Sequence, residues 1–195
     1  MPRELPRITV IRRTGTEPFI GTEHLRLKHF WEWSASDLVS NATRGILAEF
    51  LVAAAIGQSD GVRSEWDAYD LQTASGLKLE VKSSAYLQSW YQRVFSKITF
   101  SIRPTRAWNA QTNQYDSEAQ RQADVYVFAL LHHKEQDTVN ALDLSQWTFY
   151  VVSRQRLECA RPNRKSIALG QLLKIGPRVS TFHELPAVIE REGHS

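Results

Sequence analysis

The sequence predicts an α/β protein in which a mixed central β-sheet is flanked by α-helices. The clearest observation is the apolar run DVYVFALL at Asp124–Leu131, which is typical of a strand covered on both faces. A helical pattern precedes it at about residues 37–56, and shorter alternating segments surround it. The 195 residues are enough to bury one core. We therefore expect a single domain, 1–195, with its core at about residues 37–152.

The expected first helix begins at Ser36 or Asp37, since either can serve as an N-cap, and runs to about Ile56. Gly57 follows and is a common residue just past a helix end. Helical spacing assigns the core face to Leu47, Phe50, Leu51 and Ala54. Glu49 falls on a neighbouring stripe of small and apolar residues, where an ordinary surface glutamate is unusual, so we regard it as a candidate site residue. The alternative is a glutamate at the margin of the helix whose carboxylate reaches water.

A β-hairpin is expected next, with strands at Trp66–Leu71 and Leu77–Lys82. Thr73, Ala74, Ser75 and Gly76 between them are turn formers, and Gly76 can adopt a positive φ. If the turn is closed by this glycine, Asp70 lies directly across from Glu80. A shift of one residue in register would abolish that pairing.

The remaining elements follow from the same patterns. Lys97–Arg103 alternates like a third strand, and Trp147–Val152 is another candidate strand. Ser153–Ala160 and Thr181–Glu192 are expected to be closing helices. The polar stretch Pro104–Ala123 is long for a connection, so it is either a functional flap or a wrong assignment.

Two segments keep alternatives open. Ile8–Ile11 has a strand-like composition, whereas the segment after Lys82 fits either a helix or a continued strand. Within that segment Gln88 is polar among aromatic residues. It either contacts a bound nucleic acid or is satisfied by a neighbouring backbone group.

The candidate site is the polar face of the hairpin. Glu80 and Lys82 are two residues apart, so they share one face of their strand. Asp70 would place a second carboxylate opposite Glu80, and two such groups repel one another unless a cation lies between them. A solvated polar face is the simpler alternative for an exposed strand.

Asp70 followed by Glu80-Val81-Lys82, with Glu49 on the preceding helix, resembles the signature of the PD-(D/E)XK nuclease superfamily. The resemblance covers about residues 37–152 and implies the restriction-endonuclease-like fold. One departure is Tyr69, which stands where the superfamily often has proline before the aspartate. Asp67 is a second candidate for the role of Asp70.

The resemblance implies a metal-dependent nuclease that hydrolyses phosphodiester bonds, with DNA favoured over RNA. Asp70, Glu80 and the carbonyl of Val81 would hold Mg2+ or Mn2+, and Glu49 would hold a second ion or a bridging water. Lys82 would orient the attacking water or stabilise charge on the phosphate. The competing hypothesis is a non-catalytic nucleic-acid-binding module on the same fold.

Charge is only mildly informative overall, since the formal net charge is +3. It is more informative in the segment from Ser153 to Arg178, which is rich in arginine and lysine. We expect Arg161, Arg164 and Lys165 to contact nucleic-acid phosphates, although a solvated basic surface is an equal alternative.

The sequence predicts a cytoplasmic protein without a membrane partner, because it lacks the features of membrane and exported proteins. No apolar run is long enough to span a membrane, and the first residues lack the apolar core of a signal peptide. Cys159 is the only cysteine, as expected in a reducing cytoplasmic compartment. The oligomeric state stays open, with a homodimer as one alternative.

Overall fold

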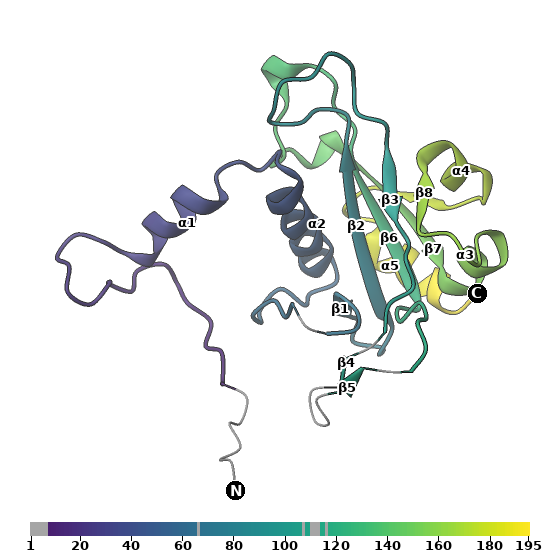
Figure 1. Ribbon diagram of the computed structural model, residues 1–195, viewed down its shortest axis with the longest axis horizontal. Coiled ribbons are helices and arrows are strands. Elements are labelled where there is room, and N and C mark those ends of the chain that lie inside the picture. The colour runs from purple at the N-terminus through teal and green to yellow at the C-terminus, as the bar shows by residue number, and fades with distance from the viewer. Residues whose placement is uncertain (1–7, 66, 107, 110–113, 116) are drawn as a thin grey trace, which may run out of the picture.

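The fold is given by a computed structural model, which describes residues 8–65, 67–106, 108–109, 114–115 and 117–195. Its centre is a five-stranded sheet in the order β1-β2-β6-β7-β9 (Figure 1). The strands are β1 (Leu71–Gln72), β2 (Lys78–Ala85), β6 (Val125–Leu131), β7 (Trp147–Ser153) and β9 (Arg178–Ser180). Only the β2–β6 pair is parallel, and the other neighbours run antiparallel. The predicted mixed central sheet flanked by helices is confirmed.

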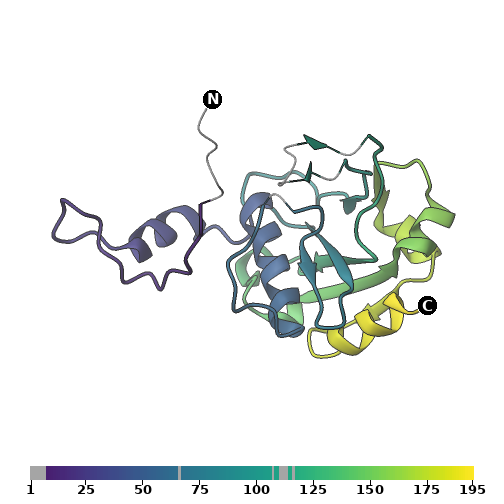
Figure 2. The ribbon, with the colours of Figure 1, turned by 90° about the horizontal axis from the view of Figure 1, so that it is seen from below.

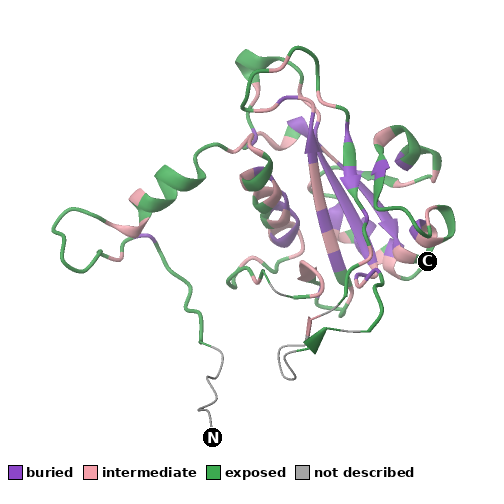
Figure 3. Ribbon diagram, viewed as in Figure 1, coloured by how far each residue is buried: buried purple, intermediate pink, exposed green. Residues whose placement is uncertain are grey.

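One face of the sheet is covered by α2 (Asn41–Ala55) and α5 (Leu185–Gly193) (Figure 2). Strand residues of alternate position, including Leu79, Val127 and Val151, pack there against the helices. All seven residues of β6 are buried, as the continuous apolar run predicts for a strand covered on both faces (Figure 3).

The other face carries a second apolar cluster. It is covered by the pair of strands β3 (Thr99–Ser101) and β8 (Ser166–Ala168), and by helices α3 (Arg154–Ala160) and α4 (Leu169–Lys174). Phe100 and Phe128 pack together in this cluster, with ring centroids 5.1 Å apart. Glu80 and Lys82 pair in register with Tyr126 and Phe128 of β6, so the predicted site residues lie on this face.

Outside the sheet, the short strands β4 (Trp108–Asn109) and β5 (Gln114–Tyr115) form a hairpin. Two single turns of 3-10 helix lie at Gln136–Thr138 (η1) and Leu144–Gln146 (η2). Helix α1 (Leu27–Ala35) stands away from the sheet (Figure 1). Among the described helices, none has the length and apolar character needed to cross a membrane.

The predicted start and core face of the first helix are partly wrong. The helix begins at Asn41, because Ser40 is its N-cap and accepts the amide hydrogen of Thr43. Asp37 instead caps a preceding turn, where its carboxylate accepts the amides of Val39 and Ser40. The core stripe is rotated from the expected one: Phe50 is 54 % exposed, and the buried positions are Arg44, Ala48, Leu51, Val52 and Ala53.

The hairpin has the expected turn but a shorter first strand. Gly76 has a φ of 95°, and Leu71 pairs with Leu79, which is the register predicted from the turn. Only Leu71–Gln72 forms strand, since residues 67–70 bend away; Trp66 lies outside the described residues. The second strand continues beyond Lys82 to Ala85, after which the chain forms a loop rather than a helix.

The other boundaries differ mainly in extent. The predicted strand at Lys97–Arg103 is reduced to β3 and belongs to the separate pair with β8. Ile8–Ile11 forms no strand and is exposed. The helix expected at Thr181–Glu192 begins at Leu185, with Pro186 in its first turn, where a proline costs no hydrogen bond. Pro104–Ala123 contains the β4–β5 hairpin and a single bridge between Thr105 and Gln120.

Candidate active site

Three of the predicted site residues, Asp70, Glu80 and Lys82, meet at the edge of the sheet where β1 begins. The backbone amide of Asp70 donates to the carbonyl of Leu79 at 2.9 Å, although Leu79 already pairs with Leu71, so Asp70 lies one residue out of the hairpin register and does not pair directly with Glu80 as predicted. The Lys82 Nζ lies 2.5 Å from Glu80 Oε1 and 3.5 Å from Asp70 Oδ2. In the structure, the ammonium group of Lys82 therefore lies between the two carboxylates. Lys82 is on the same strand, β2, as Glu80.

Asp70 is fixed in this position by the backbone of β2. The amide of Val81 donates to Asp70 Oδ2 at 2.7 Å. Leu79 and Val81 are two residues apart, so their backbone groups point to the same edge of the sheet. The carbonyl of Val81 consequently faces the edge at which Asp70 lies.

The electrostatics of this cluster follow from its partial burial. The side chains of Asp70, Glu80 and Lys82 are 20 %, 21 % and 29 % exposed. Burial and then the charge of Asp70 raise the pKa of Glu80, and Lys82 opposes this only in part. Burial alone would lower the pKa of Lys82, but Asp70 and Glu80 outweigh it and raise that pKa. Lys82 is therefore a cation at neutral pH.

The same cluster offers oxygen ligands of the kind that hard divalent cations use. No described residue donates a hydrogen bond to Asp70 Oδ1 or Glu80 Oε2, and the Val81 carbonyl lies at the same edge. Mg2+ is commonly held by one or two carboxylates and several waters, which fits this donor set. Within the described ranges, no three His, Cys, Asp or Glu side chains approach closely enough to hold an ion together.

Glu49 is paired with Arg63, an arginine that no sequence pattern singled out. Its Oε1 accepts from Arg63 Nη2 at 3.0 Å, and its Oε2 accepts from Arg63 Nε. Glu49 is 14 % exposed and adds a small upward contribution to the pKa of Glu80. Its carboxylate is thus close enough to influence the site, but both oxygens face Arg63.

Glu49 and Asp70 border the same hollow, which has a volume of about 430 Å3. Arg63 and Asp67 also line it. Asp67 is exposed and has no ion-pair partner among the described residues, whereas Asp70 contacts both Val81 and Lys82. Of the two aspartates proposed from sequence, the structure brings Asp70 to Glu80 and Lys82.

Tyr126 is a further neighbour that the strand pattern did not mark as polar. It is 4 % exposed and pairs with Glu80 across the parallel β2–β6 register. Burial, and then the nearby charge of Glu80, raise the pKa of its phenol. Tyr126 stays neutral beside the carboxylate and forms part of the wall behind it.

Gln88 lies in a network inside the protein. Its Oε1 accepts from Arg44 Nη1 at 3.2 Å, and its Nε2 donates to the Ala85 carbonyl at 3.1 Å and to Ser96 Oγ at 3.2 Å. These contacts correspond to the internal role left open by the sequence. A contact with nucleic acid stays a prediction.

The basic segment divides into two groups. Arg154 pairs with Asp124, while Arg156 and Arg178 both pair with the fully buried Glu192. These three arginines therefore have structural partners. The residues proposed as phosphate contacts are Arg161, Arg164 and Lys165, and none of them forms an ion pair with a described carboxylate.

The loop that carries this second group is held from beneath by a buried arginine. Arg121 is 2 % exposed, and its Nη2 donates to the carbonyls of Arg161 at 2.7 Å and Arg164 at 3.3 Å. Its Nε donates to the carbonyl of Ile102 at 3.1 Å. The side chains of Arg164 and Lys165 remain exposed on a loop whose backbone is fixed.

The fold and the site together describe an α/β protein with two carboxylates and a lysine at a sheet edge. Residues 24–173 match the family model described as bacteriophage T4 endonuclease IV, and this stretch is more than half of the 195-residue chain. The chain belongs to this endonuclease family. The matched region contains Glu49, Asp70, Glu80 and Lys82. No individual curated protein matches the chain. The predicted nuclease class is confirmed.

Proposed function

We propose that the protein is a metal-dependent endonuclease that hydrolyses phosphodiester bonds of DNA, with a site of the PD-(D/E)XK type. The observation that carries this proposal is the contact of Lys82 with Glu80 on the same strand and with Asp70, which directly precedes the paired strand β1. Membership of an endonuclease family supports the reaction class. DNA is favoured over RNA because the PD-(D/E)XK resemblance implies it.

Asp70, Glu80 and the carbonyl of Val81 are the groups that would hold Mg2+ or Mn2+. A bound divalent ion supplies a water of lowered pKa and offsets negative charge on the phosphate. The backbone amide of Val81 holds Asp70 in place, so the two carboxylates are positioned before an ion arrives. Glu49 would contribute a second ion site or a bridging water once its oxygens turn from Arg63.

Lys82 supplies the positive charge that the reaction needs beside these carboxylates. Its ammonium group is a donor only, and its raised pKa keeps it protonated at neutral pH. It would donate hydrogen bonds to a water or to a phosphate oxygen on which charge develops. Its contacts with Asp70 and Glu80 hold its amine beside both carboxylates, where a phosphate would approach an ion bound by them.

The experiment that tests this proposal compares cleavage with and without divalent ions. Supercoiled plasmid, single-stranded DNA and RNA are incubated with the protein in Mg2+, in Mn2+ or in EDTA. We expect cleavage of DNA in either ion and none in EDTA. No cleavage of any substrate in either ion would refute an active nuclease, and cleavage in EDTA would refute metal dependence.

Asp70→Asn and Asp67→Asn form a matched pair for the same assay. Both replace a carboxylate of the same hollow by a neutral amide, but only Asp70 contacts Val81 and Lys82. Cleavage and Mg2+ affinity should fall together for Asp70→Asn, because the amide is a weaker ligand for a hard cation. Asp67→Asn should behave like the wild type; the reverse result would move the metal ligand to Asp67.

A further inference from the structure

The segment of residues 8–35, here called the N-terminal arm, lies largely outside the packed domain. Figures 1 and 2 show its helix α1 clear of the sheet and of α2 in both views. No residue of α1 is buried. Within the whole arm only Gly15 is buried.

The arm nevertheless has a defined internal structure. Its chain folds back on itself, with the amide of Phe19 donating to the Leu25 carbonyl at 3.1 Å and that of Leu27 donating to the Glu17 carbonyl at 2.9 Å. The Glu17 carboxylate accepts the amides of Thr14 and Gly15. The arm is therefore a folded unit and not an extended tail.

This unit exposes far more apolar surface than a small folded segment usually does. Trp33 is 84 % exposed and Ile20 102 %, and Leu25 and Phe30 are each about half exposed. A segment below about 40 residues generally needs a disulfide, a metal or association to stay folded. The single cysteine of the chain, Cys159, lies outside the arm. Among the described residues no group of three His, Cys, Asp or Glu side chains could hold a metal ion either, which leaves association with another surface as the source of stability.

A matching apolar surface, here called the acceptor patch, lies on the domain of the same chain. It consists of Ile46 and Phe50 on α2 and Val62 on the loop that follows α2, and these are 49 %, 54 % and 49 % exposed. All three line the hollow that also contains Glu49 and Asp70. The acceptor patch therefore borders the candidate active site.

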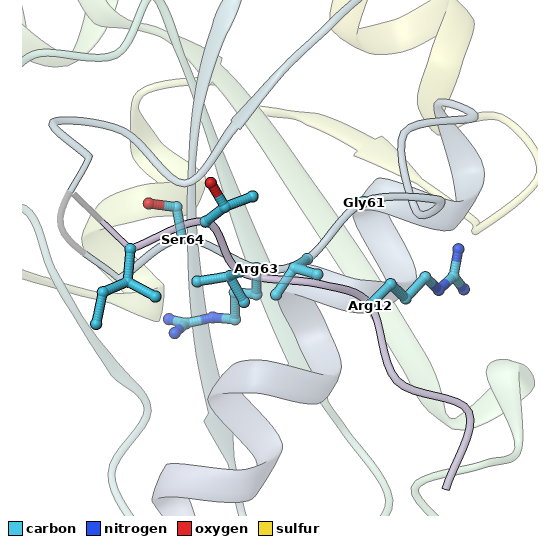
Figure 4. Close-up of a pocket in the computed structure, with 8 residues that line it drawn as sticks. Arg12, Gly61, Arg63 and Ser64 are labelled. Carbon is cyan, nitrogen blue, oxygen red and sulfur yellow. The ribbon is translucent and has the colours of Figure 1, made fainter. Parts of the chain in front are cut away.

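The arm of the same chain passes this region without filling it. Arg12 Nη1 donates to the carbonyl of Asp60 at 2.7 Å, but a hollow of about 610 Å3 remains between residues 8–12 and 61–64. In Figure 4 the guanidinium groups of Arg12 and Arg63, which both line this hollow, point in opposite directions. Its walls combine the apolar Ile8, Val10 and Val62 with polar groups of Arg12, Arg63 and Ser64, so apolar surface remains uncovered beside the arm.

We infer that the occupant is a second copy of this chain, with α1 of each copy packed on the acceptor patch of the other. Each copy supplies one unpartnered arm and one unpartnered patch. A two-fold interface therefore contains two equivalent arm-to-patch contacts, which together cover both arms and both patches. Aromatic side chains bury about 150–250 Å2 each. The exposed parts of Phe30, Trp31 and Trp33 thus offer roughly 300 Å2, and the other apolar arm residues bring the total toward the roughly 800 Å2 per partner of a stable interface.

In this dimer the arm of the second copy lines one side of the hollow that contains Glu49 and Asp70. The candidate active site is then completed by the second copy. The inference does not depend on metal-dependent cleavage, because it is drawn from the apolar surfaces alone.

The test is the mass of the full chain in solution, measured by sedimentation velocity from about 1 to 100 µM. The wild type should sediment as a species with twice the chain mass of 22.3 kDa. Trp33→Asp combined with Ile20→Asp should weaken the dimer at least about tenfold, since each change puts a charge into the interface. Leu142→Asp is the matched control, because Leu142 is 67 % exposed on a different surface and its replacement should leave the mass unchanged.

A mixing experiment tests the reciprocal geometry. Phe50→Asp alters the patch, whereas Trp33→Asp alters the arm, so a mixture of the two variants has one intact arm-to-patch contact per pair. The mixture should therefore associate more tightly than either variant alone. Circular dichroism and thermal unfolding show whether each variant keeps its fold.

A wild type that stays at 22.3 kDa up to 100 µM overturns the inference. A dimer that is insensitive to the arm substitutions overturns it as well. If the wild type is monomeric and the same arm substitutions weaken nucleic-acid binding, the arm is a nucleic-acid contact instead. Mixing that gives no gain over the single variants would exclude the reciprocal exchange.

Discussion

Replacing Lys82 by alanine separates the roles of the lysine and the two carboxylates. The substitution removes an ammonium that lies 2.5 Å from Glu80 Oε1 and 3.5 Å from Asp70 Oδ2. At about 4 Å and an effective dielectric constant of about 20, one such pair is worth about 4 kcal/mol before the cost of desolvation. Leaving charged groups without this partner costs about 1–3 kcal/mol of folding stability. We therefore expect Lys82→Ala to be less stable than the wild type by about this amount when both are unfolded in EDTA.

Divalent ions should restore much of the lost stability, because Asp70 and Glu80 then share a different cation. Cleavage should not recover. Loss of one positioned donor at a site of developing charge typically lowers kcat by about 10²–10³-fold. The assays are thermal unfolding in EDTA and in Mg2+, Mg2+ titration, and single-turnover cleavage of DNA.

Lys78→Ala is the matched control for this experiment. Lys78 lies on the same face of β2, but its amine lies over the Tyr69 ring, and it forms no ion pair with a described carboxylate. Its replacement should change neither the metal response nor cleavage. Wild-type cleavage by Lys82→Ala, or an equal loss in Lys78→Ala, would refute the assigned role of Lys82.

Three further predictions concern other parts of the molecule. Because the folded state raises the pKa of Glu80, its contribution to stability is present at low pH and is lost as the pH rises above the ordinary value of 4.5. In EDTA at pH 7, Glu80→Gln should raise Tm by about 2–4 °C for each kcal/mol of relieved repulsion, and an unchanged or lower Tm would contradict this sign. Combined charge reversal at Arg161, Arg164 and Lys165 should weaken DNA binding of all sequences alike and flatten its salt dependence, as measured by fluorescence anisotropy; unaltered binding would leave a solvated surface. Glu49→Gln should lower cleavage and shift its Mg2+ dependence, and an unshifted Mg2+ titration would limit this residue to pairing with Arg63.

The parts of the site that could be predicted from sequence are those set by local geometry. The turn that ends at Gly76 fixes which residues face each other, so the position of this glycine is enough to place Leu71 opposite Leu79 and the adjacent Asp70 close to the second strand. Two-residue periodicity likewise puts Lys82 beside Glu80. Both relations involve residues close in the chain, where few alternatives compete.

Relations between distant segments could not be read in the same way. Arg63 lies on a loop without periodicity, and only folding brings its guanidinium to Glu49. Glu192 is fully buried between Arg156 and Arg178, which turned part of an expected phosphate-binding surface into a structural ion-pair network. The core face of α2 was misjudged at Phe50, because a helix with apolar residues all round leaves its rotation to tertiary packing.

The shortness of β1 has a consequence for local opening of the protein. Asp70 is held to the sheet by a two-residue edge strand, whereas Glu80 and Lys82 belong to a strand paired over its length with the buried β6. Fraying of the edge would separate Asp70 from Glu80 while the rest of the sheet stays closed. Backbone amides of Asp70 and Thr73 should therefore exchange with deuterium faster than those of β6. Any ligand that bridges the two carboxylates binds only the closed edge, so it should slow exchange there selectively and in proportion to its concentration.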